Sequence, residues 1–215
     1  MTDDVLLAQT TRNNIVESSH YGAAIVMDAH GKTVFAAGDC TTPVFPRSTV
    51  KALQALPLLT DGAAEHFALP DAALALACAS HQGEPAHIAV ATDMLARTGF
   101  DYGVLECGTH WPLDTTSTRA LAAAGQMPCA LHNCCSGKHA GFICLACATG
   151  QDVAQYTRPA HPVMQTIART LQDLTNTPHT TENMATAGCA IPTWAIPLSA
   201  LALGFARFPP GVCLP

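Results

Sequence analysis

Two short apolar runs near the N-terminus are separated by a polar turn. The first is GAAIVM at 22–27 and the second is KTVFAA at 32–37, and both favour extended structure. The four residues between them, DAHG, are typical of a tight turn because Asp and Gly readily adopt turn conformations. The pattern therefore predicts a β-hairpin over residues 22–37.

The pattern becomes helical after Pro46. Apolar side chains then recur at the spacing of one helix face, which we expect to be buried. These side chains are Val50, Leu53, Leu56 and Leu59. Later periodic stretches predict helices at residues 85–98, 117–124, 138–149, 161–175 and 193–208.

Predicted helices outnumber predicted strands, which indicates a helix-rich α/β fold. A lone hairpin is marginally stable in water, and a sheet normally needs three or more strands. We therefore expect an antiparallel sheet that is incomplete in this chain or is completed by a partner chain.

Composition narrows the class of protein. Hydrophobic residues make up 49% of the 215 residues and charged residues only 12%, so most of the chain must be buried. The net charge is −6 and there is no basic stripe, which argues against a nucleic-acid partner. The longest apolar run, 191–206, contains two prolines and is too short to span a bilayer, so no membrane partner is expected. The N-terminal residues do not resemble a signal peptide, so we expect a cytoplasmic protein with reduced cysteines.

The stretch FPRSTVKALQAL at 45–56 carries the first candidate chemistry. Ser48 and Lys51 are three residues apart, so a helix places the hydroxyl and the amine on one face. A serine nucleophile needs a base, and lysine acts as a base only when its amine is neutral. The apolar neighbours of Lys51 would desolvate the amine, and Arg47 would add a nearby positive charge. This is the S-x-x-K arrangement of serine acyl-transfer enzymes.

A second hydroxyl strengthens this interpretation. Taken alone, the spacing fits an N-cap serine and a solvated lysine better than a catalytic pair. Ser80, in the polar loop SHQGE at 80–84, would relay protons to a leaving group. The S-D-N and K-T-G motifs of penicillin-recognising enzymes are absent, which argues against a β-lactamase.

Cysteine, lysine and histidine cluster in NCCSGKHAG at 133–141. Cys135, Lys138 and His139 stand at i, i+3 and i+4, which places them on one side of a helix start, where the zinc-binding thiolate form is favoured. Cys189 would close such a site from a distant part of the chain. Spacing alone favours buried cysteines in a tight turn, because C-x-x-K-H is not a standard zinc pattern. A third interpretation makes Cys135 a nucleophile with His139 as its base.

Four blocks of sequence together resemble one family. They are PVFPRSTVKALQALPLL at 43–59, ALACASHQGEPAH at 75–87, HNCCSGKHAGF at 132–142 and GCAIPTWAIPLSALALGFARF at 188–208. In this order they are similar to the Rhizobium-type asparaginase II family, and the resemblance runs from about residue 17 to 208.

The resemblance implies hydrolysis of L-asparagine to aspartate and ammonia, on a fold similar to serine β-lactamases and glutaminases. It implies that Ser48 is the nucleophile, Lys51 its base and Ser80 the second hydroxyl of the proton relay. It also implies zinc as a cofactor. The zinc ligands would be Cys135, Lys138 and Cys189, and the substrate-binding residues would be Arg47 and His139.

The chain also departs from the family pattern. Family members are longer, and the additional part would supply strands and a further active-site lysine. Ala187-Gly-Cys-Ala190 stands where the family usually has an acidic-Gly-Cys-Gly stretch, and Tyr21 replaces a common arginine. We expect one catalytic domain over 1–208, an unrelated tail over 209–215, and a homodimer. The alternative function is a catalytically inactive shortened homologue that folds, binds zinc and self-associates.

Overall fold

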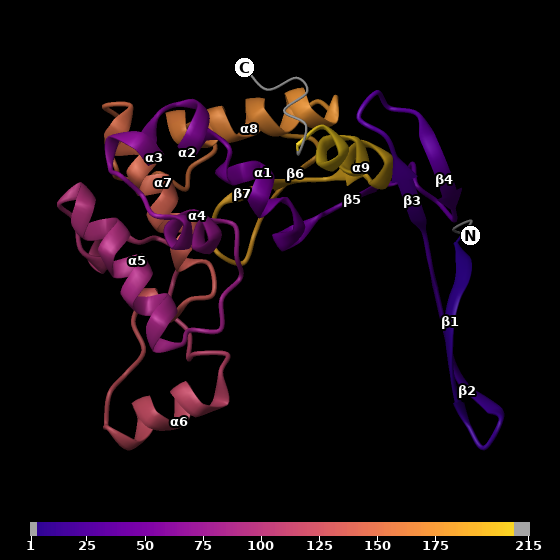
Figure 1. The fold of residues 1–215 in the computed structure, drawn as a ribbon, viewed down its shortest axis with the longest axis horizontal. Helices are drawn as coiled ribbons and strands as arrows, with labels where there is room; N and C mark the ends of the chain where they lie inside the picture. Colours follow the sequence, from indigo (N-terminus) through magenta and orange to yellow (C-terminus); the bar gives the residue numbers. More distant parts are fainter. Residues whose placement is uncertain (1–3, 209–215) are drawn as a thin grey trace. The chain divides into compact units, whose positions relative to one another are not determined.

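The computed structural model describes residues 4–208 (Figure 1). These residues form two compact units. The strand unit comprises residues 4–46, 171–178 and 195–208, and the helical unit comprises residues 47–170 and 179–194. The tail at 209–215 lies outside the described residues.

Two antiparallel hairpins make up most of the strand unit. β1 (Val5–Arg12) pairs with β2 (Ile15–Gly22), and β3 (Ala24–Met27) pairs with β4 (Thr33–Ala37). The second pair confirms the predicted hairpin. Asp28 fixes its turn, because one carboxylate oxygen accepts two later backbone N–H groups at 2.9 Å each.

The sequence pattern misses β1 and β2. Almost every side chain in both strands is exposed, so neither strand shows the alternation of apolar and polar positions that marks a half-buried strand. Backbone pairing and polar side-chain pairs hold this hairpin together. Arg12 and Glu17, for example, bring their charged atoms within 2.7 Å.

A C-terminal helix packs on the strand unit. α9 (Leu198–Arg207) contacts β3, and a backbone hydrogen bond of 3.0 Å joins Ser199 to Cys40. Just before α9, β8 (Ile196–Pro197) pairs antiparallel with β5 (Pro43–Val44). The predicted helix over 193–208 is therefore wrong at its start, because proline at 197 cannot donate within a helix and the helix begins only after it.

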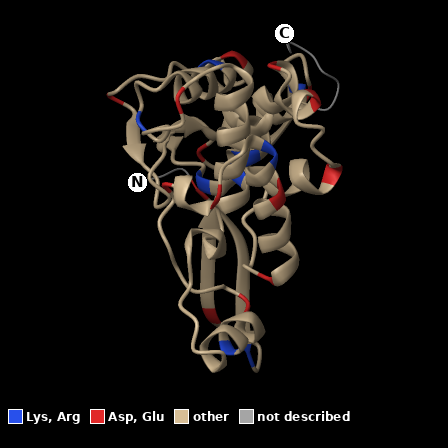
Figure 2. Cartoon of the chain, turned by 90° about the vertical axis from the view of Figure 1, so that its left-hand side faces the viewer, with Lys and Arg blue, Asp and Glu red and all other residues tan. Residues whose placement is uncertain are grey.

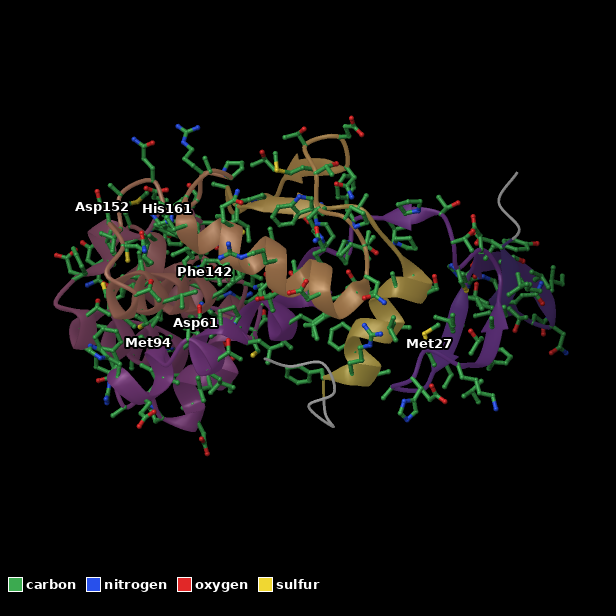
Figure 3. All side chains as sticks on the ribbon, turned by 90° about the horizontal axis from the view of Figure 1, so that it is seen from above. Met27, Asp61, Met94, Phe142, Asp152 and His161 are labelled. Atoms are coloured by element: carbon green, nitrogen blue, oxygen red, sulfur yellow. The ribbon has the colours of Figure 1, made fainter. Side chains whose placement is uncertain are left out.

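α7 (Ser136–Ala148) lies at the centre of the helical unit. Nearly all of its side chains are buried, as expected for a helix that is apolar on every side. α4 (Asp71–Ala77) and α5 (Pro85–Thr98) pack against it. Met94 of α5 and Phe142 of α7, both labelled in Figure 3, are almost completely buried.

Gly137 permits the close approach of α4 to α7. A Cβ at this position would lie 2.5 Å from Leu76 Cγ and 2.7 Å from the Leu76 carbonyl oxygen. Only glycine fits such a contact without a shift of the backbone. The approach matters for the site, because the chain leaves α4 at residue 77 and reaches Ser80 directly afterwards.

The remaining helices and one strand pair complete the elements of residues 4–208. They are η1 (Arg47–Val50), α1 (Lys51–Ala55), α2 (Pro57–Thr60), α3 (Ala63–His66), η2 (Tyr102–Val104), α6 (Thr115–Ala123), η3 (Ala130–His132), α8 (Pro162–Thr175), and β6 (Met184–Thr186) paired with β7 (Pro192–Trp194). α5 confirms the helix predicted at 85–98, and α6, α7 and α8 lie within two residues of their predicted bounds.

The buried face predicted after Pro46 is correct at three positions and wrong at the fourth. Val50, Leu53 and Leu56 are buried, but Leu59 is 56% exposed. Pro57 starts a separate short helix, so the periodicity of α1 does not continue as far as Leu59.

The described residues form a mixed α/β structure that is rich in helices and has small antiparallel sheets of two strands each. This confirms the predicted class in its broad form. Figure 2 shows acidic and basic residues dispersed along a ribbon made up mostly of uncharged residues. Among the described residues, no helix combines the length and the apolar character that crossing a membrane requires.

Candidate active site

The candidate nucleophile stands on a strained turn. Arg47, the first residue of η1, adopts φ 55°, a left-handed conformation that is uncommon for a residue with a side chain. Ser48 is exposed, whereas Lys51 at the start of α1 is only 2% exposed. Strain of this kind persists where packing enforces it, and it is common at functional sites.

Burial sets the state of the Lys51 amine. The side chain lies in the apolar interior next to Val50 and Leu53, and this desolvation lowers the pKa of Lys51 below its ordinary 10.5. A lowered pKa makes the neutral amine accessible, as a base requires.

Ser80 lies between the two residues of the S-x-x-K motif. Lys51 Nζ donates to the Ala79 carbonyl oxygen at 2.7 Å and to Ser80 Oγ at 2.8 Å, and Ser80 Oγ donates to Ser48 Oγ at 3.0 Å. The hydrogen bonds of the described residues therefore link Ser48 to Lys51 through Ser80 and not directly. The structure thus brings together all three predicted catalytic residues in one chain of hydrogen bonds.

His81 holds the Ser80 loop against the start of α7. Its backbone N–H donates to the Cys134 carbonyl oxygen at 3.1 Å. Its Nδ1 accepts the Gly83 N–H at 3.0 Å, so Nε2 carries the proton and donates to Ser136 Oγ at 2.8 Å. Burial lowers the pKa of His81 to about 4, so the ring stays neutral and serves to position the loop.

Asn133 is a site residue that the sequence analysis missed. Its side-chain NH₂ donates to the Cys107 carbonyl oxygen, and its side-chain oxygen accepts the Cys135 N–H, each at 2.9 Å. It therefore fixes the turn that presents Cys135. Its position just before the start of a helix could have indicated this role, because the Asn side chain commonly accepts hydrogen bonds from backbone N–H groups there.

A cavity of about 280 Å³ within the helical unit adjoins these groups. Its lining includes Arg47, Ser48 and Lys51 from the nucleophile turn and Cys135, Lys138 and Cys189 from the predicted metal site. The other lining residues are Gln54, His110, Asn133, Cys134, Ala187, Gly188, Ile191, Pro192 and Thr193. Ser80 and His139 are not part of the lining; His139 is completely buried.

The predicted zinc ligands lie together. Lys138 Nζ donates to Cys189 Sγ at 3.2 Å. A hydrogen bond from Cys189 lowers the pKa of Cys135 to about 6, which favours its thiolate form. The same hydrogen bond, together with burial, raises the pKa of the Cys189 thiol.

These donors fit a zinc ion only if Lys138 takes part. No group of three or more His, Cys, Asp or Glu side chains within residues 4–208 is placed to hold a metal ion. Two cysteine sulfurs are suitable zinc ligands, and a lysine amine becomes a third donor once it is deprotonated. The sulfur and amine donors therefore fit zinc as an incomplete set that leaves a position open for a further ligand.

The loop that carries Cys189 contains a second strained residue. Ala187 N–H donates to the Ile191 carbonyl oxygen at 2.8 Å, and Ala190 N–H donates to the Ala187 carbonyl oxygen at 2.9 Å. Closing this turn places Ala190 at φ 72°, where a Cβ is disfavoured. Glycine would adopt this conformation without strain.

Ser48 is thus linked through Ser80 to the buried Lys51, and Ser48 and Lys51 line the cavity. The family model for L-asparaginase II matches residues 8–211. The chain therefore belongs to the L-asparaginase II family of hydrolases, as the four sequence blocks predict, and membership of this family implies L-asparaginase activity. No curated protein matches the chain.

The strain at Ala190 yields a stability prediction. Ala190→Gly should raise the free energy of unfolding by about 0.5–1 kcal/mol, because the relief of left-handed strain exceeds the entropy that glycine adds to the unfolded chain. Chemical denaturation followed by circular dichroism measures the change. As a matched control, Ala120→Gly in the helix α6 should destabilise by about 1 kcal/mol. Equal destabilisation by both variants would show that the turn at 190 is not strained.

Proposed function

We propose that the chain hydrolyses the side-chain amide of L-asparagine through an acyl-enzyme on Ser48. The observation that carries this proposal is the hydrogen-bonded series Lys51–Ser80–Ser48 beside the cavity. Membership of the L-asparaginase II family supports asparagine as the substrate. The products are aspartate and ammonia.

The proton path follows from the order of these groups. With Lys51 neutral, Ser48 O–H donates to Ser80 and Ser80 O–H donates to the amine. As Ser48 Oγ attacks the amide carbon, its proton passes to Ser80 while the Ser80 proton passes to Lys51. The path then runs in reverse, so that the proton reaches the leaving nitrogen as the C–N bond breaks and ammonia departs.

Deacylation uses the same groups. A water attacks the ester carbon, and its proton travels through Ser80 to Lys51. The C–O bond to Ser48 then breaks, aspartate leaves, and the proton returns to the serine oxygen. Backbone N–H groups around Ser48 or in the Ser80 loop would stabilise the oxyanion of both tetrahedral intermediates.

Substrate recognition would come from the cationic side of the cavity. Arg47 lines the cavity next to Ser48 and would bind the substrate carboxylate by paired hydrogen bonds. The substrate contact expected of His139 would have to be indirect, because its ring is completely buried and lies outside the cavity lining.

We also propose that Cys135, Lys138 and Cys189 hold a zinc ion. When bound, the zinc would supply a fixed positive charge that orients the substrate in the cavity. The donor set and its place in the cavity wall support this role. The attacking water would be activated by Lys51 and Ser80, which lie next to the nucleophile.

We propose a single catalytic domain over 1–208 with a β-lactamase- and glutaminase-like arrangement, active in the cytoplasm as a homodimer. The turn that joins η1 to α1 and carries the S-x-x-K motif supports the arrangement. Exposed apolar side chains on the strand unit, including Leu7, Ile15 and Val34, support self-association.

Ammonia release from L-asparagine tests the proposed reaction. Ser48→Ala should reduce turnover by roughly 10⁴-fold or more, because the nucleophile is removed. Ser80→Ala should also reduce it, since Ser80 links the base to the nucleophile. Thr49→Ala, which removes an exposed neighbouring hydroxyl, is the matched control and should keep full activity. A folded chain that binds zinc but releases no ammonia would instead be an inactive homologue.

Cys135→Ser separates the serine mechanism from the thiol mechanism. Replacing a cysteine that is a metal ligand removes the zinc, whereas replacing a cysteine that is the nucleophile removes the covalent intermediate. We expect the variant to lose zinc, measured by metal analysis, while Ser48 remains the acylated residue. His139 Nδ1 bonds to Tyr156, and its Nε2 has no hydrogen-bond partner in the described structure, so no Cys135–His139 pair supports the thiol mechanism.

Zinc removal tests the role assigned to the metal. Dialysis against a chelator should raise KM roughly tenfold or more, the loss expected for one charge-assisted contact, with a smaller fall in kcat. Steady-state kinetics before and after zinc is added back measure both constants. A loss of kcat with KM unchanged would overturn the orienting role.

A further inference from the structure

His139 belongs to the cysteine–lysine–histidine cluster, and its contacts point to a role other than direct substrate binding. Its side chain is 0% exposed and lies on α7 directly after Lys138. Nδ1 lies 2.6 Å from the Tyr156 hydroxyl. Nε2 is buried and has no hydrogen-bond partner of ordinary geometry. A buried, unpartnered ring nitrogen costs free energy unless something nearby uses it.

Hydrogen bonds to Glu106 hold Tyr156 and its two neighbours in the chain. The side chain is 0% exposed, and its hydroxyl oxygen accepts the Glu106 backbone N–H at 2.9 Å. The Glu106 carboxylate in turn accepts the Gln155 N–H at 2.8 Å and the Thr157 hydroxyl. The two residues on either side of Tyr156 are therefore tied to the same glutamate.

The ends of this loop are closed as well. His161 Nε2 lies 2.8 Å from the Asp152 carbonyl oxygen, and both residues are labelled in Figure 3. The loop from 152 to 161 thus presents the Tyr156 hydroxyl to His139 from a fixed position.

The donors and acceptors around the hydroxyl fix the proton on His139. Because the Tyr156 oxygen already accepts the Glu106 N–H, its own hydrogen needs an acceptor. His139 Nδ1 is the acceptor within reach, so Nδ1 carries no hydrogen. In a neutral imidazole the other nitrogen, Nε2, must then carry it.

Cys189 lies close enough to the His139 ring to interact with it, although Nε2 makes no hydrogen bond of ordinary geometry. Complete burial disfavours the charged form of the ring, so His139 is neutral. Lys138 Nζ reaches the Cys189 sulfur at 3.2 Å. Lys138 and His139, at adjacent positions of α7, therefore both lie beside Cys189.

We propose that Tyr156 is a positioning residue that holds neutral His139 in the Nε2–H tautomer and directs this N–H toward the Cys189 sulfur. His139 is then a hydrogen-bond donor to a metal-binding sulfur and not a metal ligand itself. An N–H donor withdraws charge from a thiolate and fixes its orientation, which is how groups behind metal ligands tune affinity. The functional consequence rests on the proposed zinc site, whereas the tautomer does not.

Long-range ¹H–¹⁵N NMR on histidine-labelled protein tests the tautomer directly. The His139 signals are assigned by their absence from the His139→Gln variant. The expected spectrum shows one neutral tautomer with the proton on Nε2. In Tyr156→Phe, which keeps the ring but removes the hydroxyl, Nδ1 loses its donor and the pure Nε2–H spectrum should be lost.

Tyr102→Phe is the matched control, because Tyr102 is 50% exposed on η2. It should leave the His139 spectrum unchanged. A spectrum with the proton on Nδ1 in the original chain, or one that Tyr156→Phe does not alter, would overturn the proposal. This measurement needs neither metal nor substrate, so failure of the proposed asparaginase reaction would not affect its result.

Competition with a chromogenic zinc chelator tests the consequence. Tyr156→Phe and His139→Phe should each weaken zinc binding roughly tenfold. His139→Gln retains an N–H donor near the position of Nε2 and should recover part of this loss. If Tyr156→Phe lowered thermal stability but left zinc affinity unchanged, Tyr156 would be structural only. If His139→Gln and His139→Phe weakened binding equally, the donor role would be refuted.

Discussion

The burial of the Lys51 amine is the constraint on which the rest of the site depends. A charged amine in an apolar interior is expensive, so the surrounding residues favour the neutral form and lower the pKa of Lys51. Its amine donates hydrogen bonds to the Ala79 carbonyl oxygen and to the Ser80 hydroxyl. The packing that desolvates the base thus also selects Ser80 as its contact with the nucleophile.

The apolar helix α7 makes this geometry possible. Gly137 lets α4 approach it closely, which brings the Ser80 loop to the start of α7, where His81 hydrogen-bonds to Ser136. The same first turn of α7 carries Lys138 and His139 toward Cys189. One helix start therefore supports both the proton path and the proposed zinc site. Arg47 and Ala190, in two separate turns, both adopt strained left-handed conformations.

The sequence is informative where a local pattern has a single physical cause. The hairpin of β3 and β4 follows from its apolar runs and the Asp28 turn, and α5 from periodicity between clear boundaries. The hairpin of β1 and β2 leaves no such pattern, since its side chains are exposed on both faces. Leu59 is exposed because a new helix begins at Pro57, and the spacing of apolar residues does not indicate this break.

In the site, too, local sequence patterns predict some residues, whereas others depend on tertiary contacts. The S-x-x-K spacing predicts that Ser48 and Lys51 act together, and the structure places Ser80 between them, which no spacing within one helix could indicate. Asn133 and Tyr156 escape notice because each acts through a tertiary hydrogen bond to a distant part of the chain. Neither residue belongs to a sequence motif from which its hydrogen-bond partner could be predicted.

The ionisation of Lys51 tests the account most directly. The chain contains only three lysines, Lys32, Lys51 and Lys138, so ¹³Cε-lysine labelling gives three NMR signals that single substitutions assign. Titration of these signals measures the pKa of each amine. The account predicts that the pKa of the Lys51 amine lies below its ordinary 10.5, so that the neutral base forms as pH rises and is lost as pH falls through that lowered pKa. A Lys51 amine that stays charged up to its ordinary pKa would contradict the role of a buried base.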